Sequence, residues 1–321
     1  DFNCQANRFA NFLLSRGIRK GEKVAILLMN CLEWLPIYFG ILKAGAIAVP
    51  LNYRYTAEEI RYCLNLAEAD FLVFGPEFTG RVEEICDCMP RVRSMLYVGK
   101  DCPTFAESYD RLTQFCTSKN PDVPLTEDDD AAIYFSSGTT GFPKAILHTH
   151  RSLSHAAQVE QHHHGQTKDD VFLCIPPLRG VTPEWILKAV SEEQCTIVWL
   201  LVPWAQDLLD ALDRKDLNLD DYNLDQWRLM HIGAQPVPPS LVKRWKAYFP
   251  HHAYDTNYGL SESIGPGCVH LGVENPHKVG AIGKAGYGWE VKIVDPNHNT
   301  VPQGEVGELA VKGPGVMKCY Y

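Results

Sequence analysis

The sequence predicts an α/β protein with two doubly wound, mostly parallel α/β subdomains and a small C-terminal β subdomain. In the first 250 residues, short apolar runs alternate with segments of helical periodicity, and from Gly280 onward the pattern changes to short, glycine-rich strands. This alternation implies right-handed crossovers and a sheet covered on both faces. With 321 residues, 45% of them hydrophobic, the chain can bury a sizeable core. We expect subdomains at residues 1–116, 117–275 and 276–321.

Helix signals are clear in the first subdomain. Phe2, Phe9 and Leu13 share a helical face, and Gly17 follows as an expected C-cap. A capping box at residues 56–59 marks the start of another helix. We expect helices at 2–16, 32–44, from 56 onward and at 77–89, with strands at 24–28, 46–51, 71–74 and 94–98.

A polar segment, residues 117–130, leads into the second subdomain. Its acidic end, residues 127–130, is expected to be a solvated lead-in and not a metal site. The remaining predicted strands lie at 131–135, 171–175, 196–201, 228–233, 289–294 and 308–312, and the helices at 183–192, 204–212 and 239–248.

Composition narrows the function classes. A net charge of -9 argues against a general affinity for nucleic acid or for an anionic membrane. No apolar run approaches the length of a transmembrane helix, and no signal-peptide pattern is present. The eleven cysteines include one C-x-C pair, Cys86 and Cys88, without a second pair to complete a zinc site. We therefore expect a cytoplasmic protein in which most cysteines are reduced core thiols, and the oligomeric state stays open.

A loop of glycine and hydroxyl residues ending in a lysine follows the apolar run at 131–135. Glycines let the backbone N–H groups approach an anion, and Lys144 supplies a mobile positive charge. A Walker A loop is excluded because Pro143 precedes this lysine and Ala145 follows it. A flexible surface loop is an open alternative for such a stretch alone. The candidate phosphate-binding residues are Ser136, Ser137, Gly138, Thr139, Thr140, Gly141 and Lys144.

A second candidate site lies at residues 254–263. Tyr258 can stack on a purine, Gly259 permits close backbone approach, Ser261 can donate to an oxyanion, and Glu262 can hold Mg²⁺ through oxygen. Taken alone, a polar strand end is the simpler interpretation.

The histidines are weaker candidates. Three adjacent residues, 162–164, cannot point the same way on a helix or strand, so we expect an exposed polar run and not a metal site. His148 and His150 would share a face if they lay in one strand, where a structural role is as plausible as catalysis. No G-x-S-x-G nucleophile motif is present.

Residues 134–145 resemble the signature loop of the adenylate-forming (ANL) superfamily, [YF]-[ST]-S-G-[ST]-T-G-x-P-K-G, with Ala145 as the departure. The segment 258–262 resembles the superfamily's Y-G-x-[TS]-E motif, and weaker resemblances cover 21–25, 42–50, 233–238 and 304–309. The chain as a whole thus resembles the large N-terminal domain of an acyl-CoA synthetase, an AMP-dependent ligase.

This resemblance implies ATP-dependent activation of a carboxylic acid through an acyl-AMP intermediate, followed by thioester formation with CoA. Positioning and charge stabilisation would then carry most of the catalysis. The loop with Lys144 would hold the outer phosphates, and Glu262 would bind Mg²⁺. Ser261 would contact the α-phosphate or the carboxylate. The base and acyl site would be lined by Gly233, Ala234, Gln235, Asn257, Tyr258 and Gly259.

Three departures from the superfamily pattern are expected to matter. The sequence ends at Tyr321, so the mobile C-terminal domain with its adenylation lysine is expected to be absent, and the fragment impaired. Asp1 falls inside what resembles the superfamily's first helix, so the N-terminus is also expected to be cut. Residues that line the acyl pocket are expected to be missing between Leu178 and Arg179. The identity of the carboxylic acid therefore stays open. Two alternative functions also stay open, an adenylation module that loads a carrier protein and a non-catalytic nucleotide-binding protein.

Overall fold

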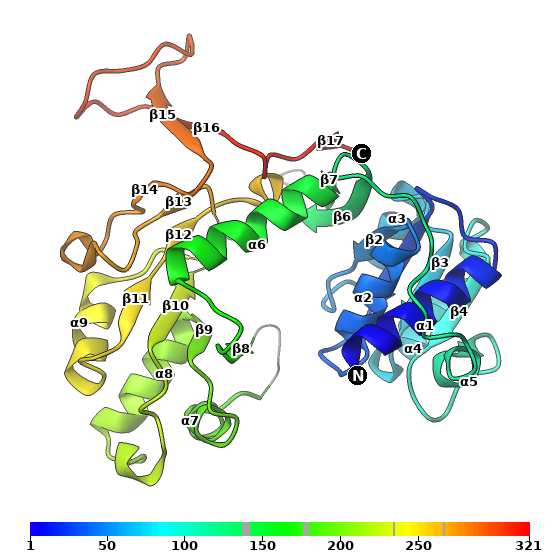
Figure 1. The fold of residues 1–321 in the computed structure, drawn as a ribbon, viewed down its shortest axis with the longest axis horizontal. Helices are drawn as coiled ribbons and strands as arrows, with labels where there is room; N and C mark the ends of the chain where they lie inside the picture. The colour runs from blue at the N-terminus through cyan, green and yellow to red at the C-terminus, as the bar shows by residue number, and fades with distance from the viewer. Residues whose placement is uncertain (137–141, 176–179, 234, 266) are drawn as a thin grey trace. The chain divides into compact units, whose positions relative to one another are not determined.

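The computed structural model describes residues 1–136, 142–175, 180–233, 235–265 and 267–321 (Figure 1). The chain divides into two compact units, one of Asp1–Leu153 with Met317–Tyr321 and one of Ser154–Val316. Each unit contains a sheet with parallel pairing and packed helices, so the predicted α/β class is confirmed.

The first unit is built on one eight-stranded sheet in the order β17-β7-β6-β2-β1-β3-β4-β5. Its central strands are parallel, whereas β6 and β7 form an antiparallel pair. We expected the strand at 131–135 in the second subdomain, but it joins this sheet beside β2 through the pair Ala48 and Ala132. The strands are β1 (Lys23–Leu27), β2 (Ile47–Pro50), β3 (Phe71–Phe74), β4 (Ser94–Tyr97), β5 (Glu107–Ser108), β6 (Asp130–Ser136), β7 (Lys144–Thr149) and β17 (Cys319–Tyr320).

Helices cover both faces of this sheet because successive strand residues point to opposite sides. In β1, Ala25 and Leu27 pack with α3 and α4, while Val24 and Ile26 pack with α1 and α2. The predicted capping box at Thr56 is present and starts α3. The helices are α1 (Phe2–Ser15), α2 (Trp34–Lys43), α3 (Ala57–Leu66), α4 (Thr79–Ile85) and α5 (Tyr109–Thr113), with the 3-10 turns η1 (Pro76–Phe78) and η2 (Cys86–Cys88).

The second unit has a parallel four-stranded sheet in the order β11-β10-β9-β8. Met230 and Ile232 of β10 face an apolar core shared with α7, α8 and α9. Helix α7 has the predicted bounds because Thr182 caps it and Pro183 fits its first turn. The elements are β8 (Phe172–Cys174), α7 (Pro183–Glu192), β9 (Ile197–Leu201), α8 (Val202–Asp213), η3 (Leu219–Asp221), β10 (Leu229–Gly233), α9 (Pro239–Tyr248) and β11 (Ala253–Asp255).

Short antiparallel strands complete the second unit. Trp289 packs with Val159 and Cys268, and an added Cβ at Gly313 would lie 2.5 Å from its ring. These strands are therefore fixed by one large aromatic side chain. The elements are β12 (Asn257–Tyr258), η4 (Ser261–Ser263), β13 (Val269–His270), η5 (Pro276–Lys278), β14 (Lys284–Ala285), β15 (Glu290–Val294) and β16 (Glu308–Lys312).

Helix α6 (His150–His164) is a fifteen-residue element that the sequence analysis missed. His148 lies in β7 and His150 begins α6, so the two do not share a strand. The prediction of an exposed run at 162–164 is wrong for His164, whose ring is buried. The helical pattern was obscured because the buried face of α6 is largely polar.

The cysteine prediction is only partly right. All eleven cysteines are free thiols, but three of them, Cys63, Cys195 and Cys268, are buried. Among the described residues, no helix is long and apolar enough to cross a membrane.

Candidate functional site

The expected phosphate loop joins two strands of the first unit. β6 ends at Ser136 and β7 begins at Lys144, and these two residues are paired in the ladder. Lys144 is exposed, with its Nζ 5.5 Å from the centre of the Tyr320 ring. The expected binding residues Ser137, Gly138, Thr139, Thr140 and Gly141 lie outside the described residues, as do Ala234 and the junction at Leu178.

The second motif occupies β12 and η4 in the second unit. Ser261 and Glu262 are half-buried at the start of η4. An added Cβ at Gly259 would lie 2.5 Å from the Gly265 carbonyl oxygen and 2.7 Å from Gly267 Cα. These glycines therefore let two backbone segments touch, and this close contact explains why glycine occupies these positions.

Tyr258 is half-buried and packs against the apolar cluster that contains Trp289. This packing holds the Tyr258 ring in position while part of the side chain stays exposed.

The segment after β10 lies beside the second motif. Gly233 ends β10, and an added Cβ there would lie 3.4 Å from Asn257 Oδ1. Gln235 is exposed. The fold thus brings Gly233 and Asn257 together at the carboxyl end of a parallel strand, the edge where open α/β sheets bind ligands. Lys144 belongs to the first unit, whereas these residues belong to the second.

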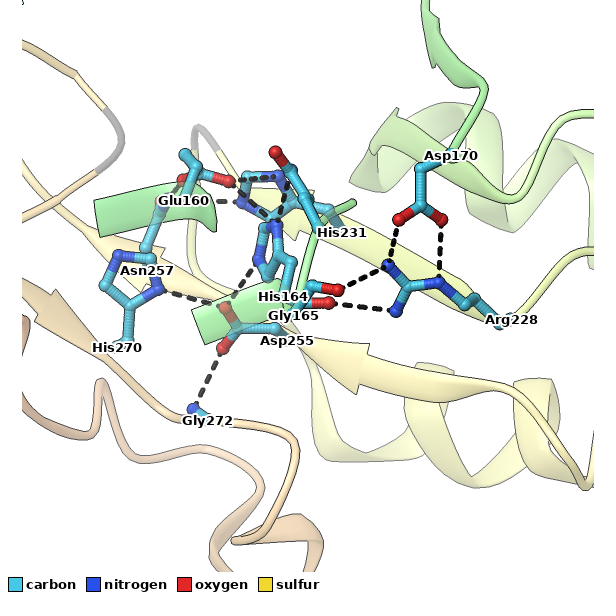
Figure 2. A network of polar contacts seen from close by, with 11 residues as sticks. Glu160, His164, Gly165, Asp170, Arg228, His231, Asp255, Asn257, His270 and Gly272 are labelled. Carbon is cyan, nitrogen blue, oxygen red and sulfur yellow. Dashed lines mark hydrogen bonds and ion pairs between the residues drawn. The ribbon is translucent and has the colours of Figure 1, made fainter. Parts of the chain in front are cut away.

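A buried polar network joins α6 to the face of the sheet opposite the apolar core, and none of its members was predicted (Figure 2). His164 Nδ1 lies 2.9 Å from Glu160 Oε2, and its Nε2 lies 2.9 Å from Asp255 Oδ2. The same Asp255 oxygen is 2.9 Å from His270 Nδ1. His231 Nδ1 lies 3.5 Å from Glu160 Oε2. Two carboxylates and three imidazoles thus form one largely buried cluster.

This network reaches a predicted site residue. Asn257 Nδ2 lies 3.3 Å from Glu160 Oε1 and 3.1 Å from His231 Nε2. The other Asp255 oxygen accepts a hydrogen bond from the Gly272 backbone N–H at 2.9 Å. Both carboxylates are therefore held on more than one side (Figure 2).

The charges in the network depend on these contacts. Burial alone would lower the pKa of His164, but hydrogen bonds to Asp255 and Glu160 raise it to about 9. Burial alone would raise the pKa of Asp255. Hydrogen bonds from His164 and His270 outweigh burial, so the pKa of Asp255 is lowered. The pKa of Glu160 is lowered in the same way, against burial, chiefly by His164. Burial lowers the pKa of His231 to about 4, so this ring is neutral at pH 7.

Arg228, just before β10, is held by an ion pair with Asp170 and donates a hydrogen bond to the end of α6. Arg228 Nε lies 2.9 Å from Asp170 Oδ1, its Nη2 lies 2.9 Å from Asp170 Oδ2, and its Nη1 donates to the His164 carbonyl at 2.9 Å (Figure 2). This bidentate pair places the His164 backbone at a defined position over the sheet.

The i,i+4 spacing of Glu160 and His164 was a signal that the sequence analysis did not use. On a helix this spacing puts both side chains on one face, whereas their partners on distant strands could not be inferred.

Comparisons with known proteins identify the family. The sequence model of the AMP-binding enzyme family matches residues 1–181 and 177–321. The chain belongs to the AMP-binding enzyme family. The two matched segments meet at the junction where the sequence analysis expects missing residues.

Curated relatives are CoA ligases. The chain is 28% identical over 345 residues to a crotonobetaine/carnitine–CoA ligase of Salmonella agona, covering 99% of this chain and 66% of the relative. A ligase of the same description from Proteus mirabilis is 26% identical over 356 residues, again with 66% of its length covered. The chain thus spans slightly less than two thirds of these relatives.

Solved structures of the family share the fold. The inhibitor-bound N-terminal domain of FACL13 from Mycobacterium tuberculosis is 25% identical with a TM-score of 0.88, covering 99% of this chain and 82% of that one. The anthranilate CoA ligase AuaEII in complex with anthranoyl-AMP is 25% identical with a TM-score of 0.89, covering 99% of this chain and 65% of that one.

Proposed function

We propose that this protein is an AMP-forming acid–thiol ligase, which activates a carboxylic acid with ATP and transfers the acyl group to CoA. The family match over the whole chain carries this proposal. CoA-ligase relatives that align over at least 99% of the chain support the choice of CoA as acceptor. The free thiols are consistent with a cytoplasmic reaction.

The chemistry needs the acid's carboxylate to attack the α-phosphate of ATP, with pyrophosphate as the leaving group. The thiol of CoA then attacks the acyl carbon and releases AMP. In this proposal Lys144 offsets charge on the outer phosphates, Glu262 holds Mg²⁺, and Ser261 donates to the α-phosphate or the carboxylate. The carboxyl end of β10, where Gly233 and Asn257 meet, supplies the wall of the nucleotide or acyl site.

A thermal-shift screen of this chain tests the proposal. The ligands are ATP with and without Mg²⁺, AMP, and non-hydrolysable acyl-adenylate mimics with carnitinyl, anthraniloyl, short and long acyl groups. Binding to the native state stabilises it by about 2.7 kcal/mol at a hundredfold excess over Kd. A shift selective for one acyl group names the acid class, whereas no shift with any nucleotide or adenylate contradicts the proposed function.

A further inference from the structure

The two ring nitrogens of His164 face two different carboxylates. Glu160 Oε2 and Asp255 Oδ2 each lie 2.9 Å away, one from each nitrogen. An ionised carboxylate only accepts hydrogen bonds, so both nitrogens must donate, and a ring that donates twice is an imidazolium. Geometry therefore places one positive charge between two buried negative charges.

The other groups packed against His164 are neighbours on α6, two rings from the sheet and one arginine. His163 is the preceding residue on α6, and its Nε2 accepts from the Tyr287 N–H at 3.0 Å. The Gln166 carboxamide lies 3.4 Å from Nδ1, farther than Glu160, and either end of an amide can face the ring after a 180° turn. His231 and His270 approach from the sheet side, with ring centres 4.6 and 6.3 Å from that of His164. Arg228 bonds only the backbone oxygen of His164.

A proton explains this centre better than a metal ion does. Glu160, His164 and His270 each offer a ligand atom, all within 4.8 Å of one another. A metal on either nitrogen of His164 would, however, displace a hydrogen bond that a buried carboxylate already receives at 2.9 Å. The imidazolium satisfies both carboxylates at once.

This charged centre sets the orientation of Asn257. Glu160 is held by His164 through Oε2, which leaves Oε1 facing Asn257 Nδ2 at 3.3 Å. The neutral His231 ring presents its Nε2 at 3.1 Å from the same amide nitrogen and can accept from it. A reversed amide would place its oxygen against the Glu160 carboxylate, which can only accept. The carboxamide is thus fixed with nitrogen inward.

The oxygen of Asn257 consequently points away from the network. It lies beside Gly233, where an added Cβ would be 3.4 Å from Oδ1. Among the described residues, Oδ1 accepts no hydrogen bond. A hydrogen-bond acceptor is therefore presented at the carboxyl end of β10, beside the two motifs assigned to the nucleotide or acyl site.

We propose that His164 is a positioning residue, whose imidazolium, held between Glu160 and Asp255, fixes Asn257 so that its side-chain oxygen accepts a hydrogen bond from the exocyclic amine of adenine. This inference rests on the proposed function, since it needs a nucleotide at this edge of the sheet. Adenine offers a donor at that position and hypoxanthine offers an acceptor. The orientation of one amide thus selects the base.

Isothermal titration with AMP and with inosine monophosphate tests the orientation. The wild-type chain is expected to bind AMP about tenfold or more tightly, because inosine would set two acceptors against each other. In Glu160→Gln the new amide oxygen must accept from His164, which turns its NH₂ group toward Asn257 and reverses that carboxamide. The preference for AMP should then disappear or invert. Glu192→Gln, which neutralises an exposed carboxylate on α7, should keep the wild-type preference.

Histidine ¹⁵N NMR tests the imidazolium independently of any ligand. His164, assigned by the signal lost in His164→Gln, should be protonated on both nitrogens at pH 7. A neutral His164, or loss of its protons on adding one equivalent of Zn²⁺, overturns the charged centre. Equal binding of AMP and inosine monophosphate by the wild type overturns the base-selecting role while the nucleotide site stands. Failure to bind any nucleotide or adenylate instead removes the proposed function, and this inference with it.

Discussion

The stability of the second unit should fall between pH 7 and 8.5, and His164 should cause the fall. The pKa of this ring is raised from 6.5 to about 9 in the folded state. A raised folded-state pKa contributes stability that is complete below the unfolded value and is lost as pH rises through the folded one. The full contribution is about 3 kcal/mol, and about 2 kcal/mol of it is lost between pH 7 and 8.5.

Most other titrating groups do not distinguish wild type from a His164 variant between pH 7 and 8.5. Burial lowers the pKa values of His163 and His231 to about 4, which reduces stability at low pH. This destabilisation is almost gone by pH 7, so both rings leave stability constant at higher pH. Burial raises the pKa of the Cys63 thiol to about 12, so stability also falls as unfolded thiols begin to ionise near pH 8.5, in wild type and in a His164 variant alike. Any fall between pH 7 and 8.5 that is absent from a His164 variant therefore belongs to this ring.

Urea unfolding followed by tryptophan fluorescence measures the effect, because six of the seven tryptophans lie in the second unit. His164→Gln should be less stable at pH 7 by about 3 kcal/mol, since it leaves Asp255 without its charged partner. Its deficit relative to wild type should shrink by about 2 kcal/mol at pH 8.5. The exposed His251→Gln should keep the wild-type slope. A deficit of the same size at both pH values would refute the imidazolium.

Three further changes test the proposed site. Lys144→Ala should weaken ATP binding several-fold more than AMP binding in calorimetry, because its charge is proposed to face the outer phosphates; equal losses would contradict that role. Glu262→Gln should weaken Mg²⁺-ATP binding but leave AMP binding without Mg²⁺ unchanged, and unaltered Mg²⁺-ATP affinity would remove the proposed metal ligand. Gly259→Ala should lower Tm, by an amount equivalent to about 1–3 kcal/mol, because its Cβ would lie 2.5 Å from the Gly265 oxygen. Gly80→Ala, with open space around its Cβ, is the matched control, and an equal Tm for both variants would show that the close backbone contact is not needed.

Several elements were predictable because their signals are local. The capping box of α3 is a contact between residues three apart, and Thr182 with Pro183 sets the start of α7 from within one turn. The strand at Phe71–Phe74 is a short apolar run whose ends are marked by its own neighbours. The glycine- and hydroxyl-rich loop and the segment 258–262 indicated a nucleotide chemistry because residue type and order alone carry that pattern.

Only the tertiary structure decided which strands share a sheet and which polar groups share a proton. An apolar run marks β6 as a strand, but its place beside β2 depends on a pairing between Ala48 and Ala132, far apart in the chain. The spacing of Glu160 and His164 fixes one face of a helix, while Asp255 reaches that face only because β11 packs beneath it. A buried charge depends on every group around it, and those groups come from segments that the linear sequence keeps separate.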